Sequence, residues 1–427
     1  MKRVIRLARA RWLNITAGCL CLAVLSGCDL ITDPKLLMKP PQSTSSLQSL
    51  RSVIDANIPP DTRLQPRGLN GIQSIQTEDL DNNGNKDAVV FFESTKGDAN
   101  AQGMVLEETE DTWVIKQKFE GDGRSLVSLE YRDLNHDGRK VILAGFSKED
   151  LDERRILAVY AFTGQKVDKI LLAPYSNYVV EDLNDDDLLE VTTVDFKKND
   201  YNLVTCYQIR EDQAIKLDSL QLGAGLNDYL NVMSGKVTPN QNGIVLDASY
   251  LTHSAYSTLI MMKDNKLVNV LDQDDNLNDL PIRSGDVNDD DILEMGRLKI
   301  PSGWEKVILD KPPRFLDYYQ WEEKVTSGDL KDMKFIKEQY MDPDGRFVFD
   351  FPDNLKGKVT LDQNSVVDQY LRFVKIDNHE LVAEIKFVPL SQWEKLKPEW
   401  SLLMRDNDQV IVYKTSFNTE IMKKNLR

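Results

Sequence analysis

Cysteine and histidine are scarce in this chain of 427 residues, which contains four cysteines and three histidines. Three of the cysteines lie in the first 28 residues, so Cys206 is alone in the rest of the chain and no disulfide framework can form there. The histidines lie in separate segments without the H-x-x-x-H spacing of a zinc hydrolase, and no nucleophile-elbow, phosphate-loop or dinucleotide motif occurs. The sequence therefore gives no positive sign of catalysis. Cys206 lies in an alternating apolar and polar run, so we interpret it as a small buried hydrophobe.

Basic residues are fewer than acidic ones: the chain has 53 lysines and arginines and 69 aspartates and glutamates, which gives a formal net charge of −16. Such a surface repels phosphate backbones, so nucleic-acid binding is not expected, whereas cations such as Ca²⁺ are attracted. After the N-terminal region, no apolar run approaches the roughly 18 residues of a membrane-spanning helix. With 41% hydrophobic residues the chain is globular, and its length predicts two domains.

The first 28 residues have the features of an export signal. Five basic residues and no acid lead into an apolar stretch of 14 residues, 12–25, which is shorter than a spanning helix. The stretch ends in Leu25-Ser26-Gly27-Cys28, which closely resembles the lipobox of bacterial lipoproteins. The resemblance implies cleavage before Cys28 and attachment of a lipid, with fatty acids such as palmitate, to its sulfur. The alternative is a poorly cleaved signal with a buried cysteine.

We therefore predict a signal peptide over residues 1–27 and a lipidated, flexible tether over residues 28–48. Loss of the five basic residues leaves 48 against 69 acids, a mature net charge near −21. The protein is then expected to be anchored by its lipid to the outer face of the cytoplasmic membrane. In a cell with two membranes this is the periplasmic side of the inner membrane, because Asp29 resembles the signal that retains a lipoprotein there.

An acidic segment recurs through the middle of the chain. Four copies begin at Asp79, Asp133, Asp182 and Asp286, at separations of 54, 49 and 104 residues. The last separation is about two periods, and residues 236–243 fill the gap with a degenerate copy that keeps turn residues and lacks the acids. Each copy leads into short β-rich runs and a two-residue turn signal. Three or four strands per fifty residues predict a mainly β chain, with a β-propeller of about five blades over residues 49–340.

The pattern D-x-[DN]-x-[DN]-G-x-x-[DE] before a strand resembles the FG-GAP/VCBS repeat of integrin-α-type propellers, over roughly residues 65–340, and the bulk of the chain is similar to FG-GAP lipoproteins of Bacillus-like bacteria. The resemblance implies structural Ca²⁺, bound by the side chains of positions 1, 3, 5 and 9 and the carbonyl of position 7. The expected ligands are Asp79, Asp81, Asn83, Asn85 and Asp87 in the first copy; Asp182, Asn184, Asp186 and Glu190 in the third; Asp286, Asn288, Asp290 and Glu294 in the fifth; and, with fewer matching acids, Asp133, Asn135 and Asp137 in the second.

The later copies depart from the pattern. Val141 replaces the ninth-position acid of the second copy, and Asp187 and Asp291 replace the glycine of the third and fifth. None is an EF-hand, because the twelfth position never holds the glutamate that an EF-hand requires. The alternative to metal binding is a set of acidic turns that only shape the backbone. Two similar segments are interpreted otherwise, residues 272–276 as a linker and 342–345 as a hairpin turn.

The last part of the chain, residues 341–427, is predicted to form a small α+β domain whose first strands can contribute to the fifth blade. Strands are expected at 347–351, 357–361, 371–376, 381–387 and 409–415, and helices at 390–396 and 419–426. The aromatic group Tyr318, Tyr319 and Trp321 is interpreted as part of a core strand rather than as a sugar-stacking surface.

Three functions of different classes follow. The first is a Ca²⁺-stabilised binding module at the cell envelope that presents loops to an envelope protein or a cell-wall polymer. The second is an envelope assembly or structural factor without a small ligand. The third is a Ca²⁺-dependent polysaccharide-active enzyme. The first rests on fold analogy, and it is the one that the motifs favour.

Overall fold

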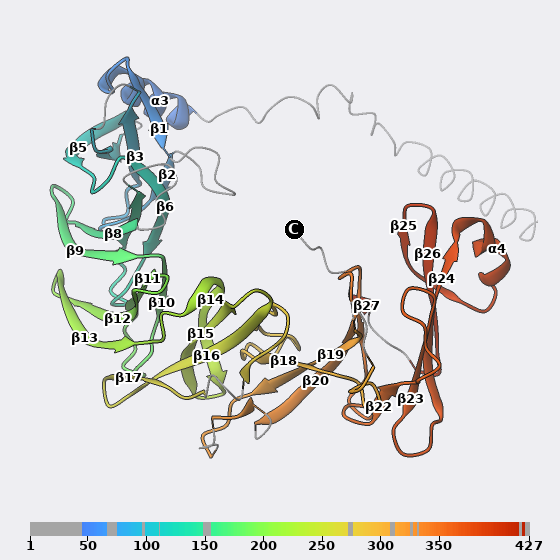
Figure 1. Ribbon diagram of the computed structural model, residues 1–427. Coiled ribbons are helices and arrows are strands. Elements are labelled where there is room, and N and C mark those ends of the chain that lie inside the picture. The colour runs from blue at the N-terminus through green and yellow to red at the C-terminus, as the bar shows by residue number, and fades with distance from the viewer. Residues whose placement is uncertain are drawn as a thin grey trace, which may run out of the picture. The chain divides into compact units, whose positions relative to one another are not determined.

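The protein is described from a computed structural model, which is shown in Figure 1. The structure describes residues 45–65, 75–95, 99–110, 112–147, 155–271, 276–307, 312–324, 328–330, 333–417 and 421–422. The predicted signal peptide, Cys28 and Asp29 lie outside the described residues. Residues 45–48, predicted as the end of the tether, instead form the first turn of α3 (Ser45–Asn57).

The described chain is mainly β, as the sequence predicts, and its strands form six antiparallel sheets. The first sheet contains β1 (Thr62–Gln65), β2 (Gln76–Glu78), β3 (Asp87–Ser94), β4 (Gln102–Thr109) and β5 (Thr112–Glu120). The second contains β6 (Ser125–Arg132), β7 (Val141–Ser147), β8 (Arg155–Phe162) and β9 (Val167–Tyr175), and the third contains β10 (Asn177–Glu181), β11 (Glu190–Lys197), β12 (Tyr201–Arg210) and β13 (Gln213–Gln221). The fourth contains β14 (Leu226–Thr238), β15 (Gln241–Tyr250), β16 (Ser254–Lys263) and β17 (Lys266–Asn269). The second, third and fourth sheets are simple up-and-down meanders. The repeat therefore corresponds to one sheet per unit.

The fifth sheet crosses the predicted boundary between residues 340 and 341, because the first strands after the boundary contribute to this sheet, as predicted. It contains β18 (Met295–Lys299), β19 (Arg314–Gln320), β20 (Lys334–Met341), β21 (Val348–Asp350) and β27 (Ile421–Met422), in that order. The boundary falls inside β20, and the predicted turn at 342–345 joins β20 to β21, where the Gly345 amide donates to the Asp342 carbonyl at 2.8 Å. The described residues of the helix expected at 419–426 form β27, which pairs with β21.

The sixth sheet contains the remaining C-terminal strands in the order β22, β23, β24, β26, β25. Their bounds are β22 (Val359–Leu361), β23 (Tyr370–Lys375), β24 (Leu381–Pro389), β25 (Ser401–Asp406) and β26 (Gln409–Thr415). A short helical segment, η3 (Leu390–Gln392) and α4 (Trp393–Leu396), lies between β24 and β25, as predicted for 390–396. The sequence pattern does not predict β25.

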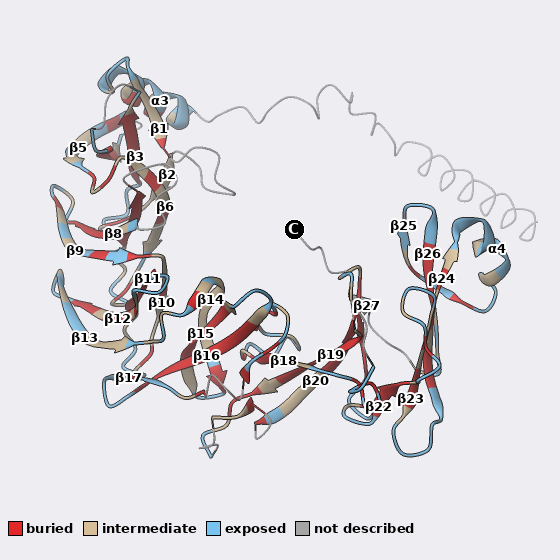
Figure 2. Ribbon diagram, in the orientation of Figure 1, coloured by how far each residue is buried: buried red, intermediate tan, exposed pale blue. Residues whose placement is uncertain are grey.

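Hydrophobic cores lie between successive sheets rather than inside any one of them. The core between the first two sheets includes Phe91 and Tyr160, and the core between the third and fourth includes Cys206, which is fully buried as predicted. Figure 2 shows buried residues concentrated on inner strands such as β15 and β16. These inner strands are buried along almost their whole length because each faces a neighbouring sheet on both sides.

The fifth and sixth sheets share an aromatic core. Phe315 and Tyr340 of the fifth sheet and Phe373 of the sixth belong to one buried cluster. The predicted core role of the aromatic group near 320 is confirmed, because Tyr318 is 7% and Trp321 is 3% exposed.

By density of contacts the chain divides into two units, residues 1–58 with Glu108–Val114, and Pro59–Glu107 with Ile115–Arg427. In the described part of the first unit, α3 buries Leu50 and Ile54 completely, and the Trp113 indole donates a hydrogen bond of 3.3 Å to Ser46 Oγ. None of the described helices is both long and apolar enough to cross a membrane.

Candidate metal centre

Each of the four acidic segments lies in a connection that leads directly into a strand of its sheet. The first, second and third precede β3, β7 and β11, and the last precedes β18. All four share one backbone, because the fourth and sixth positions of each loop have φ between 54° and 87°. These positions are Asn82 and Gly84, His136 and Gly138, Asp185 and Asp187, and Asp289 and Asp291. As expected, Asp187 and Asp291 adopt the left-handed conformation in which glycine is more comfortable.

In the first loop, Asp79 organises the backbone while other carboxylates face one another. The Asp79 carboxylate accepts hydrogen bonds from the Asn83 amide at 3.1 Å and from the Gly84 amide at 2.9 Å. One oxygen from each of Asp79, Asp81 and Asp87 lies within 4.8 Å of the others, and no other group of three potential ligands among the described residues is this close. Asn83 lies beside this group and donates to Asp81 Oδ2 at 3.1 Å.

Asp87, the ninth-position acid, is the buried member of the group, with 1% of its surface exposed. Its Oδ2 accepts a hydrogen bond of 2.9 Å from the Leu80 amide, whereas Oδ1 has no hydrogen-bond partner among the described residues. Asp81 Oδ1 is likewise buried without a partner in the described part of the chain. Burial raises the pKa of Asp87 to about 7, and the charges of Asp81, Glu107 and Asp79 act in the same direction. A buried carboxylate oxygen without a donor is unfavourable unless a cation neutralises it.

The oxygens that converge here fit Ca²⁺, which prefers six to eight hard oxygen ligands. Asp79, Asp81, Asn83 and Asp87 would hold the ion with their side chains, and Asn85 would add its carbonyl. The structure adds Glu107, which the sequence pattern did not indicate. Glu107 lies directly opposite Asp87 on β4, accepts a hydrogen bond of 2.9 Å from Asn83 Nδ2 and forms an ion pair of 2.8 Å with Lys116. Only the strand register reveals Glu107, because it lies 20 residues beyond the loop.

The third loop brings its predicted ligands together but satisfies them with protein donors. Gln208 Nε2 donates to Asp186 Oδ2 and to Glu190 Oε1, at 2.8 Å each. Arg210 forms an ion pair of 2.9 Å with Asp186, and the Leu183 amide donates to Glu190 Oε2 at 2.9 Å. Asp182 accepts from backbone amides, and Asn184 lies against Asp186. A guanidinium and an amide thus occupy the side of the loop on which the first copy has the carboxylate of Glu107.

The second loop also contains its own cation. Asp133 accepts from the Asp137 and Gly138 amides, as Asp79 does in the first loop. Arg139 donates from Nε and Nη2 to Asp137 Oδ2 at 3.0 and 2.9 Å. Val141 replaces the acid of the ninth position, and the Arg139 guanidinium forms an ion pair with Asp137. This loop therefore neutralises its carboxylate with an arginine instead of leaving it available to a metal ion.

The fifth-copy loop is intermediate between the first and the third. Glu294 is fully buried, its Oε2 accepts from the Val287 amide at 3.0 Å, and its Oε1 has no partner among the described residues. Burial raises the pKa of Glu294 to about 7, an effect that the charge of Lys334 partly offsets. Asp286 accepts from loop amides, and Asn288 Nδ2 donates to Asp290 at 2.9 Å. This loop keeps one orphaned oxygen, where the first loop has two.

Neighbouring units are joined to one another through these loops. In each of the first two contacts, the carbonyl of the second loop residue accepts a hydrogen bond from a backbone amide of the next unit. Lys140 N donates to Leu80 O at 2.8 Å, and Leu189 N donates to Leu134 O at 2.9 Å. Asn242 Nδ2 makes the equivalent contact with Asp182 O at 2.7 Å, and Leu293 N donates to Lys236 O at 2.7 Å. We call this series of bonds the loop ladder. It passes through the degenerate fourth unit, where a tight turn after Thr238 replaces the acidic loop.

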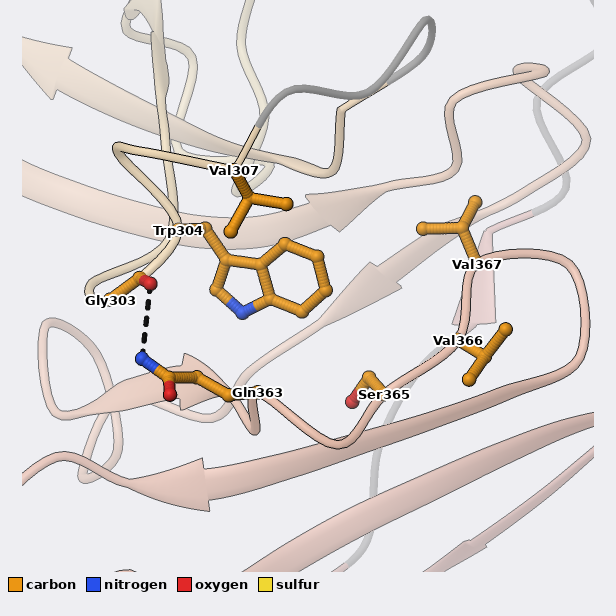
Figure 3. A pocket seen from close by; sticks show the side chains of 7 residues that line it. All are labelled: Gly303, Trp304, Val307, Gln363, Ser365, Val366 and Val367. Atoms are coloured by element: carbon orange, nitrogen blue, oxygen red, sulfur yellow. Dashed lines mark hydrogen bonds between the residues drawn. The ribbon is translucent and has the colours of Figure 1, made fainter.

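A pocket of about 500 Å³ lies away from these loops, between the segment that follows β18 and the loop that joins β22 to β23. Figure 3 shows the Trp304 indole at its centre, with Val307 and Val366 beside it. Gln363 Nε2 donates to the Gly303 carbonyl at 3.1 Å, and the indole donates to the Leu361 carbonyl at 2.8 Å. The described residues that line the pocket are largely apolar and include no titratable side chain.

The described fifth sheet also holds a pair of carboxylates, Asp317 and Glu338, opposite each other on β19 and β20. Lys299 forms ion pairs of 2.9 Å with both, and their exposures are 2% and 0%. This arrangement resembles an acid–base pair only in composition. A substrate cannot reach carboxylates that are buried and already paired, so the pair does not support a hydrolase.

Comparison with protein-family models and with curated protein sequences gives no match. Among solved structures, a rhamnogalacturonan lyase from Bacillus licheniformis is 8% identical over 80% of this chain and 89% of its own, with a TM-score of 0.32. The rhamnogalacturonan lyase YesW is 8% identical over 82% of this chain and 92% of its own, also with a TM-score of 0.32. A Bacteroides fragilis protein of proposed 6-phosphogluconolactonase activity is 11% identical over 71% and 82% of the two chains, with a TM-score of 0.28. TM-scores this low support no argument about the fold or the function of this chain.

Proposed function

We propose that this chain is an extracytoplasmic lipoprotein, anchored through Cys28, whose stacked sheets form an FG-GAP-type β-propeller that Ca²⁺ stabilises. Its role is that of a binding module at the cell envelope. The observation that carries the proposal is the first loop, where two buried carboxylate oxygens, on Asp81 and Asp87, have no donor among the described residues. Outside the cytoplasm Ca²⁺ is available at the millimolar concentrations that sites of this grade require.

The four acidic loops do not contribute equally to this function. The first is the principal Ca²⁺ site, and the fifth-copy loop around Glu294 is a second. In the second loop Arg139 replaces the metal, and in the third loop Arg210 of β12 does so through its ion pair with Asp186. All the hard ligands of the first site are held by one loop and the adjoining strands, so the ion fixes the entry of β3 into its sheet. Its role is structural.

Thermal unfolding of the full chain in EDTA and in 5 mM CaCl₂ tests the calcium part of the proposal. We expect Ca²⁺ to raise the melting temperature, because each occupied site of extracellular grade adds about 1–2 kcal/mol. An Asp79→Asn/Asp81→Asn variant should lose the share of the increase that the first loop supplies, and the remainder comes from the loop around Glu294. The matched control is Asp133→Asn/Asp137→Asn, which removes the same two charges from the loop with its own arginine and should keep the full increase. An equal increase in all three proteins would mean that the first loop is only a turn.

The anchoring part is tested separately, by expression in a bacterial host with labelled palmitate followed by membrane fractionation. The wild-type chain should incorporate label and sediment with membranes, and Cys28→Ser should do neither. Cys206→Ala is the control, because it removes the other cysteine of the mature chain at a fully buried site. Label that persists in Cys28→Ser would contradict the assignment of the lipobox.

A further inference from the structure

A second pocket, of about 530 Å³, borders the fifth-copy loop, and its lining includes three lysines together with Asp289, Asp350 and Asp353. Lys334 and Lys337 come from β20, and Lys356 follows β21. The chain as a whole has a net charge of −16, so non-specific attraction of anions to its surface is weak. A local group of ammonium ions around one concavity is therefore a distinct feature of this surface.

The structure holds two of these ammonium groups in place and leaves N–H donors unused. Lys337 Nζ donates to the Val287 carbonyl at 2.9 Å and pairs with Asp350 at 3.0 Å. Lys356 Nζ donates to the Ile336 carbonyl at 2.7 Å and lies 3.3 Å from Asp353. An ammonium group has three N–H donors, so within the described part of the chain each of the two keeps one for a ligand.

Lys334 is the most available of the three. It is exposed, and it donates a hydrogen bond of 2.9 Å to Gln320 Oε1. Beneath the lysines lies the half-buried Phe335 ring, which stacks on Tyr319 with centroids 5.3 Å apart and carries Lys356 Nζ at 5.5 Å. The aromatic floor fixes the position of the Lys356 charge instead of offering a free stacking face.

Acceptors stand at the rim of the same pocket. Asp289 is exposed, and Asp353 has a side chain that is 93% exposed. An ion pair as exposed as Lys356 with Asp353 contributes little, so a ligand can displace it. The lysine N–H groups inside the pocket can bind an anionic group, and the carboxylates at its edge can accept hydrogen bonds from hydroxyl groups. A ligand with an anionic group and neighbouring hydroxyls therefore fits the pocket.

We propose that this pocket binds the anionic unit of a hydroxylated envelope polymer, with its carboxylate or phosphate between Lys334, Lys337 and Lys356. This rests on the proposed binding role and gives that role a site and a class of partner. The hydroxyls of the unit reach Asp289 and Asp353. The two sources of such chemistry are a uronic-acid glycan and a polyol-phosphate polymer, which share the charge and the hydroxyl-rich backbone.

Isothermal titration of the purified full chain in 1 mM CaCl₂ tests this inference with three probes: an oligoglucuronate, an oligomer of glycerol phosphate, and neutral maltotetraose. We expect one anionic probe to bind at least tenfold more tightly than maltotetraose, and more weakly as NaCl is raised from 50 to 300 mM. Lys334→Glu should weaken that binding at least tenfold. Its matched control is Lys397→Glu, which makes the same change at a lysine of 59% exposure beyond α4 and should change the affinity less than twofold.

The identity of the bound anionic probe distinguishes the glycan from the polyol phosphate. Failure of both anionic probes to bind, or equal binding by wild type and Lys334→Glu, would overturn the inference. Lys334 is an exposed side chain, and an unchanged melting temperature of its variant confirms that the protein is folded. Neither negative result touches the proposed function, whose failure would appear as a missing response to Ca²⁺ or missing lipidation.

Discussion

Replacement of Asp87 by asparagine is expected to stabilise the calcium-free protein at pH 8 and to abolish the stabilisation by Ca²⁺ that the first loop supplies. In EDTA the wild-type chain keeps a buried carboxylate whose Oδ1 has no donor among the described residues. The amide introduced by Asp87→Asn is neutral, keeps the hydrogen bond from Leu80, and can donate to the orphaned oxygen of Asp81. The variant also lacks the charged ligand that a cation needs, so the two effects have opposite signs.

The pH dependence follows from the pKa of Asp87, which burial raises from 3.8 to about 7. Between these values the folded state binds a proton that the unfolded state has lost, so stability falls as the pH rises through this window and levels off above it. The loss over the whole window is on the order of 4 kcal/mol for one group. Calcium-free wild type should therefore melt at a higher temperature at pH 5 than at pH 8. Ca²⁺ binds the ionised carboxylate, so its benefit should be larger at pH 8.

Glu190→Gln is the matched control for Asp87→Asn. Glu190 is fully buried, burial raises its pKa to about 7, and protein donors already satisfy both its oxygens. Melting curves from pH 5 to 8, with and without Ca²⁺, should show that Glu190→Gln keeps the calcium response that Asp87→Asn loses. A calcium response of full wild-type size in Asp87→Asn would show that the first loop binds no ion that stabilises the protein.

Phe373→Ala is expected to lower the free energy of unfolding by about 3–5 kcal/mol and to loosen the fifth and sixth sheets together. The Phe373 ring, on β23, lies 5.0 Å from the ring of Tyr340, 5.6 Å from Phe349 and 5.4 Å from Phe351, measured between centroids. These partners lie on or next to strands of the fifth sheet. Truncation leaves a cavity at the shared core, which neighbouring rings fill only in part.

Hydrogen exchange of backbone amides, combined with chemical denaturation, measures this effect. Protection should fall in β19 to β24, whereas Phe119→Ala, which removes a ring next to Phe91 and Tyr160, should affect the first and second sheets instead. Loss of protection confined to the sixth sheet would show that the C-terminal strands fold independently, as the sequence predicts.

The sequence was sufficient for the features that depend on local pattern. The spacing of the acids located four loops with a common backbone, and Lys236 and the residues after it marked the fourth unit correctly. Hairpin turns were visible for the same reason, since Asp264 and Asn265 both have the positive φ that such turns require. Binding of metal stays a prediction.

The features that the sequence did not reveal depend on contacts between distant strands. Gln208 and Arg210 lie about 20 residues after their loop. They reach it only because β12 pairs Gln208 with Glu190, and Arg210, two residues further on, reaches Asp186. Glu107 joins the first loop through the equivalent register on β4. The helix expected at 419–426 was wrong where the chain is described, because pairing with β21 determines the conformation of Ile421 and Met422.

The loop ladder has a consequence for how such a repeat can evolve. Its bond from Lys140 to Leu80 and its bond from Leu189 to Leu134 join backbone atoms, so they survive almost any change of side chain. A unit can therefore lose its acids one at a time or gain an arginine without detaching from its neighbours, whereas the unit with the tight turn contacts the preceding unit through the Asn242 side chain. The five units of this chain represent such a series, from a loop with two orphaned carboxylate oxygens to one with no acid at all. The acidic residues of one loop can therefore change without a change in the other loops, while the backbone hydrogen bonds between neighbouring sheets are kept.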